Sequence, residues 1–204
     1  MRIGILQCDD VMDELQPEFG NYPAMFEALL GEIAPDWEYV TYRVIDGEFP
    51  DSVDACDGYI STGSRYSVND GYPWIGQLET FVSALAQAGK KYVGICFGHQ
   101  LLANVMKGRA ELSDRGWGVG MSFNQIDIKK FCPYYMLQYG DHMMSVQGHP
   151  EFSQPYSSAL MARRADRIPA PRGREGQASL AAKVDDRLMM RWIINFFAKD
   201  GALG

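Results

Sequence analysis

Cys96 lies where a short apolar run meets a helical pattern, a position from which a cysteine can act as a nucleophile. Residues 92–95 read as a strand, and residues 98–107 repeat apolar side chains at helical spacing. A side chain at such a sharp turn projects from the carboxyl end of the strand. The helix N-terminus would face the sulfur and favour its reactive thiolate form. The alternative interpretation is a buried structural cysteine at a strand end.

His149 and Glu151 could supply the groups that such a nucleophile needs. They flank Pro150 directly after residues 141–147, which are expected to form a strand. Because Pro150 restricts the backbone, both side chains can point to the same region. Glu151 could then orient the imidazole of His149, which would act as base and acid for Cys96. We therefore expect a Cys96–His149–Glu151 triad suited to acyl transfer.

The elements that must position these residues alternate along the chain, which predicts a mostly parallel sheet with helices on both faces and a few antiparallel edge strands. Ligands bind outside the carboxyl ends of such strands, where both Cys96 and Gly63 are expected. The N–H groups of Gly63 and Phe97 could bind an oxyanion, although residues 62–64 alone are more typical of a simple turn. Strands are expected at 2–7, 37–45, 57–62, 92–95, 109–112, 116–121 and 141–147, helices at 25–33, 74–88, 98–107, 157–166 and 180–198, and a loop at 168–177.

Composition excludes several functional classes. The chain has 204 residues and a net charge of −7, so we expect one domain (residues 1–204), with no nucleic-acid partner and no membrane surface. Residues 1–7 read as a strand rather than a signal peptide.

Four irregularly spaced cysteines indicate thiols and a cytoplasmic location. The three histidines form no ligand cluster, because His99 suits a packing role and His142 a turn, so neither a metal nor a cofactor is expected.

Two segments, GICFGHQ (residues 94–100) and GHPE (residues 148–151), together resemble the paired signatures of class I glutamine amidotransferases. Residues 62–64 and 116–120 are similar to a subset of stand-alone domains that includes the plant γ-glutamyl peptidases. The resemblance extends over nearly the whole chain. It implies a flavodoxin-like fold and hydrolysis of a γ-glutamyl amide, from glutamine or a small γ-glutamyl compound, through a thioester on the cysteine.

The same resemblance implies roles for individual residues. Cys96, His149 and Glu151 would form the triad. Gly63 and Phe97 would form the oxyanion hole. Gln100 and Ser64 would contact the substrate.

The sequence also departs from the family pattern. Many members have Gly-Gly-Pro where this chain has Thr62-Gly63-Ser64, which argues against association with a synthetase subunit, and no synthetase domain is expected here. A glutaminase that delivers ammonia to a separate synthetase is nevertheless kept as an alternative. A non-enzymatic protein of the DJ-1/PfpI type is a further alternative, because that group also has a cysteine at a strand-to-helix turn. The presence of His149 and Glu151 after a late strand argues against this alternative. Between residues 130 and 131 the family usually has a longer stretch, and the broken pattern indicates an omitted segment rather than a deletion.

Overall fold

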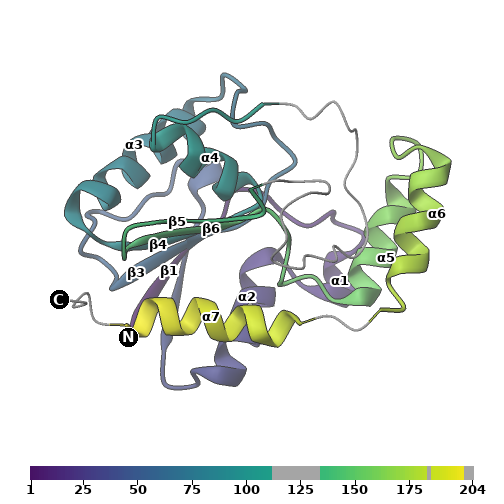
Figure 1. Ribbon diagram of the computed structural model, residues 1–204, viewed down its shortest axis with the longest axis horizontal. Helices are drawn as coiled ribbons and strands as arrows, with labels where there is room; N and C mark the ends of the chain where they lie inside the picture. The colour runs from purple at the N-terminus through teal and green to yellow at the C-terminus, as the bar shows by residue number, and fades with distance from the viewer. Residues whose placement is uncertain (112–133, 183–184, 200–204) are drawn as a thin grey trace.

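A single twisted sheet organises the molecule (Figure 1). The computed structural model describes residues 1–111, 134–182 and 185–199. Within them, the strand order is β2-β1-β3-β4-β6-β5, and every neighbouring pair is parallel except β5 with β6. This mostly parallel, flavodoxin-like arrangement confirms the predicted fold class. The strands are β1 (Arg2–Leu6), β2 (Glu38–Tyr42), β3 (Gly58–Ser61), β4 (Lys91–Ile95), β5 (Met136–Tyr139) and β6 (Met143–Val146).

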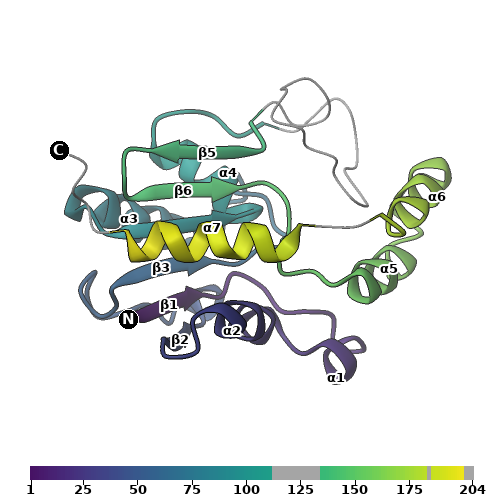
Figure 2. The ribbon, with the colours of Figure 1, turned by 60° about the horizontal axis from the view of Figure 1, so that its bottom comes forward.

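Helices cover both faces of the sheet because strand side chains alternate between two apolar layers. Ile3 and Ile5 point to one layer, which contains α2 (Tyr22–Ile33) and α7 (Asp186–Ala198). Leu6 points to the other, which contains α3 (Pro73–Ala88) and α4 (Phe97–Val105). Figure 2 shows α2 and α7 together in front of the strands. The two layers hold the central strands rigidly, so the carboxyl edge can support a site.

A third group of helices extends beyond the carboxyl edge of the sheet (Figure 2). It contains α1 (Gln16–Phe19), α5 (Gln154–Arg163) and α6 (Ala170–Ser179). The predicted loop at 168–177 is therefore wrong. Pro169 and Pro171 lie at the N-cap and in the first turn of α6, where no backbone N–H is needed, so these prolines begin the helix. Apolar contacts among Met161, Ile168 and Leu180 pack α6 on α5.

Other predicted boundaries also change. Residues 109–111 carry no strand, contrary to expectation, and the rest of the two expected edge strands lies outside the described residues, as does the junction between residues 130 and 131. The last helix begins at Asp186 rather than near residue 180, and a short 3-10 helix η1 (Val44–Asp46) follows β2. Among the described helices, none combines the length and the apolar character that crossing a bilayer requires.

Candidate active site

Cys96 occupies the turn between β4 and α4 in a backbone conformation that L-residues rarely adopt. Its φ of 51° and ψ of −95° place it outside the common allowed regions, which costs about 1–3 kcal/mol in a typical protein. The flanking glycines make the turn possible. A Cβ on Gly94 would collide with the carbonyl oxygen of Gly98, and a Cβ on Gly98 would collide with the Ser61 hydroxyl. The sharp strand-to-helix turn expected at this cysteine is present.

The sheet register brings the segment after β6 beside Cys96. Strands β4 and β6 are parallel neighbours with Ile95 opposite Val146, and the N–H group of Cys96 donates a hydrogen bond to the Val146 carbonyl at 2.8 Å. The chain that leaves β6 therefore emerges next to the elbow. Gln147 and His149, one and three residues beyond β6, reach the sulfur from this side.

The imidazole of His149 is held at three places. Its Nδ1 is 2.8 Å from Oε1 of Glu151, whose side chain is fully buried while that of His149 remains 27% exposed. The ring of Phe152 stacks on the imidazole with centroids 4.0 Å apart and an interplanar angle of 10°. Gly63 lies against Cε1, where a Cβ would collide with the ring. These contacts leave the second ring nitrogen for Cys96.

The charges around His149 favour its protonated form. Burial alone would lower the pKa of His149, but the charges and hydrogen bonds of Cys96 and Glu151 outweigh burial and raise the pKa to about 10. Within the described residues, Oε2 of Glu151 is buried and accepts no hydrogen bond. The carboxylate therefore acts on the ring through Oε1, which suits a protonated imidazole.

The two predicted oxyanion donors lie at neighbouring strand ends. Gly63 follows β3, and β3 pairs with β4, which leads into the elbow. Phe97 is the first residue of α4, where the N–H group has no partner within the helix. Both residues are buried. This placement suits them to the charge that develops beside the sulfur during acyl transfer.

The two predicted substrate-contact residues differ in their surroundings. The hydroxyl of Ser64 accepts a hydrogen bond from the N–H group of Tyr66 at 3.2 Å, so it stabilises its own loop. The amide of Gln100 donates to Oε1 of Gln147 at 3.3 Å, so it lies one side chain away from the sulfur. Gln100 is thus close to the sulfur of Cys96, whereas the hydrogen bond of Ser64 is local to its own loop.

Two residues in this cluster are absent from the sequence-based candidates. Gln147 donates from Nε2 to the sulfur of Cys96 at 3.6 Å, and Phe152 stacks on His149. Each lies within two residues of a candidate, and Gln147 ends the predicted strand. Their position beside His149 and Glu151 is the signal that could have identified them.

His99 has the packing role predicted for it. It is 5% exposed, and its Nδ1 shares a 2.9 Å hydrogen bond with the Ser145 hydroxyl. Burial lowers the pKa of His99 to about 4. The neutral ring therefore ties α4 to β6 beneath the elbow.

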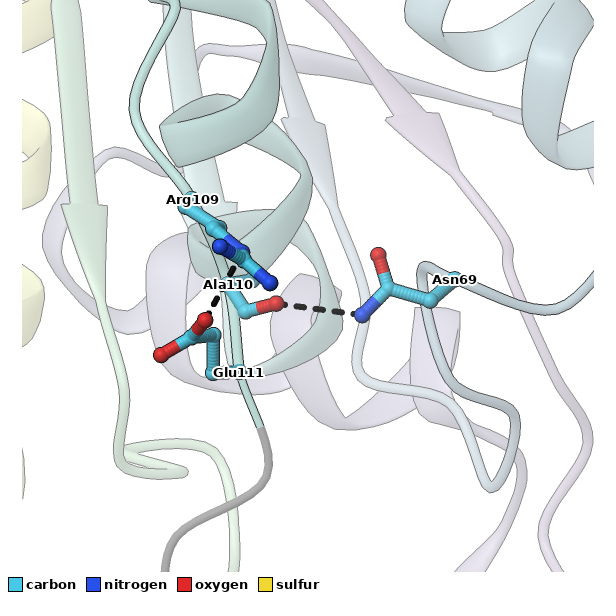
Figure 3. A pocket seen from close by; sticks show the side chains of 4 residues that line it. All are labelled: Asn69, Arg109, Ala110 and Glu111. Atoms are coloured by element: carbon cyan, nitrogen blue, oxygen red, sulfur yellow. Dashed lines mark hydrogen bonds and ion pairs between the residues drawn. The ribbon is translucent and has the colours of Figure 1, made fainter.

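A pocket of about 430 Å³ lies between the loop that follows β3 and the segment that follows α4 (Figure 3). Its lining groups are bonded to one another. The Asn69 amide donates to the Ala110 carbonyl at 3.0 Å, and Arg109 pairs with Glu111 at 2.7 Å. It contains none of the predicted site residues. Across the described part of the chain, no three His, Cys, Asp or Glu side chains gather as metal ligands.

Curated proteins of two organisms are similar to this chain in sequence. No family model matches the chain. Gamma-glutamyl peptidase 5 of Arabidopsis thaliana is 29% identical over 177 residues, which cover 67% of this chain and 70% of that protein. A glutamine amidotransferase-like protein of Schizosaccharomyces pombe is 31% identical over 196 residues, which cover 74% of this chain and 79% of that protein.

Two solved structures share the fold. A glutamine amidotransferase from Methylobacillus flagellatus superposes with a TM-score of 0.65 and 16% identity, covering 97% of this chain and 92% of that one. A glutamine amidotransferase from Thermotoga maritima gives a TM-score of 0.64 and 13% identity, covering 97% and 96%. With the sequence relatives, these likenesses lead to one conclusion: the chain belongs to the class I glutamine amidotransferase family.

Proposed function

We propose that this protein hydrolyses the γ-glutamyl amide bond of glutamine or of a small γ-glutamyl compound. The observation that carries the proposal is the pairing of Cys96, at a strained strand-to-helix turn, with an imidazole that Glu151 holds at 2.8 Å. A nucleophile, a base and an orienting acid in this order support acyl transfer. The relatives named gamma-glutamyl peptidase favour a γ-glutamyl group as the acyl portion.

The mechanism follows from the positions of these groups. The Cys96 thiolate attacks the δ-carbonyl carbon, and the N–H groups of Gly63 and Phe97 bind the oxyanion. The C–N bond breaks as His149 gives its proton to the leaving ammonia or amine, which leaves a thioester on the sulfur. His149 then takes a proton from water, whose oxygen attacks the same carbon. The C–S bond breaks, glutamate leaves and the thiolate is restored.

The alternatives make different predictions. A glutaminase that supplies ammonia to a separate synthetase would be slow alone and faster when its partner is added. A non-enzymatic protein of the DJ-1/PfpI type would release no glutamate, and the buried Glu151 carboxylate bonded to His149 argues against it. The hydrolase proposal predicts activity from the protein by itself.

The test measures glutamate released from glutamine and from γ-glutamyl dipeptides. Cys96→Ala and Cys96→Ser should each lower the rate by about a thousandfold or more, because removing a nucleophile removes most of the catalysis. Cys56→Ala is the matched control, since Cys56 is also a free thiol but packs in the core beside Tyr42. A γ-glutamyl adduct on Cys96, seen by mass spectrometry after rapid quenching, would support the thioester. An unchanged rate in Cys96→Ala would rule the mechanism out.

A further inference from the structure

The side-chain amide of Gln147 lies against the reacting sulfur. Its Nε2 is 3.6 Å from Sγ of Cys96, within the range for a hydrogen bond to sulfur. The sheet explains this contact. Because Ile95 and Val146 are paired in the parallel register, the next residues on the two chains, Cys96 and Gln147, leave their strands side by side. The N–H group of Gln147 also donates to the Tyr135 carbonyl at 2.8 Å, which holds its backbone to the segment before β5.

A second amide sets the orientation of the first. Gln100, on α4, donates from Nε2 to Oε1 of Gln147 at 3.3 Å. With its oxygen occupied in this way, Gln147 presents its NH₂ group to the sulfur. Both glutamines are partly buried, so these hydrogen bonds face limited competition from water. The result is a chain of donors from Gln100 through Gln147 to Cys96.

We propose that Gln147 is a further catalytic residue, which stabilises the Cys96 thiolate by donating an amide N–H to it, and that Gln100 fixes this orientation. Hydrogen bonds to an ionised acceptor are stronger than neutral ones. From the same segment after β6, His149 also acts on Cys96 and supplies positive charge, while Glu151 is hydrogen-bonded to its Nδ1. Unlike His149, a neutral amide stabilises the anion without exchanging a proton.

This role rests on the proposed function for its catalytic consequence. When water attacks the thioester and the C–S bond breaks, the electron pair moves to the sulfur. The Gln147 donor therefore meets more negative charge in this transition state than in the thioester. An interaction that strengthens in this way accelerates the step, so Gln147 should act mainly on release of the acyl group.

The first experiment needs no substrate. Thiolate absorbance near 240 nm is titrated against pH, after subtraction of the matching Cys96→Ala variant to remove the other cysteines. Gln147→Met keeps the length of the side chain but removes the donor. It should raise the pH of half-titration by about one unit, the size expected for losing a hydrogen bond to a charged group. Gln138→Met is the matched control, because Gln138 is the exposed residue of β5 and its amide donates to the Gly140 carbonyl, and it should titrate like the parent.

The second experiment tests the orienting amide and the reaction. Gln100→Met should shift the titration in the same direction, and the double variant should shift it no further than Gln147→Met alone. With a γ-glutamyl substrate, Gln147→Met should lower kcat about tenfold with a smaller change in KM and accumulate the acyl-enzyme. An unshifted titration in Gln147→Met would overturn the proposal, even if the parent hydrolyses its substrate. If the titration shifts in Gln147→Met but the parent protein releases no glutamate, the hydrogen bond from Gln147 to the thiolate is supported and the proposed function is refuted instead.

Discussion

Adding one methyl group at Gly63 should inactivate the protein while leaving its fold intact. A Cβ at this position would collide with Cε1 of His149 and lie 3.4 Å from both ring nitrogens. The backbone itself accepts alanine, because the φ of Gly63 lies outside the positive range that favours glycine. The perturbation in Gly63→Ala is therefore directed at the imidazole.

The expected magnitude follows from contact distances. Carbon atoms separate by about 3.5–4.0 Å at best contact, so the imidazole must move by about 1 Å to admit the new methyl group. The ring cannot simply tilt away, because Phe152 covers its face and Glu151 holds Nδ1 at 2.8 Å. A displacement of about 1 Å in catalytic geometry typically costs about a hundredfold in rate. We expect kcat of Gly63→Ala to fall by about that factor, with a smaller change in KM.

The assay combines glutamate release with thermal unfolding. Gly76→Ala is the matched control, because Gly76 lies in α3 with open space around it, and it should keep full activity with equal or higher stability. In a His149→Ala background, Gly63→Ala should lose its effect on stability, since the ring it collides with is gone. Wild-type kcat in Gly63→Ala would refute the reasoning, and so would an equal loss of stability in both backgrounds.

Two further predictions concern the histidines. Phe152→Leu should lower kcat about tenfold in a glutamate-release assay, whereas Phe152→Tyr should retain activity, because an aromatic ring keeps His149 in place; equal rates in both would contradict this. Since the folded pKa of His99 is lowered to about 4, the unfolded chain binds the extra proton between about pH 6.5 and 4. Stability should therefore fall by up to about 3 kcal/mol as pH drops through that window. His99→Gln, which can still bond Ser145, should reduce this loss in urea unfolding.

The sequence alone determined the candidate catalytic groups and the architecture that holds them. An apolar strand followed at once by Cys96 and a glycine predicts a strand-to-helix turn from local preferences. The His149-Pro150-Glu151 segment limits where its side chains can point by the same kind of local constraint. The alternation of strands and helices predicts a parallel sheet, because each apolar face must be covered. The turn at Cys96 and the mostly parallel sheet are both present, since each prediction depends on patterns of residues close together in the chain.

Tertiary structure decided which distant groups meet. The contact of Gly63 with His149 and that of Gln147 with Cys96 depend on strand order and register, and no local pattern encodes either. A shift of one residue in β6 would turn Gln147 to the other face of the sheet. The helix at Ala170–Ser179 was missed for a related reason. Its prolines and glycines favour a loop locally, but packing against α5 supplies the free energy that stabilises it as a helix.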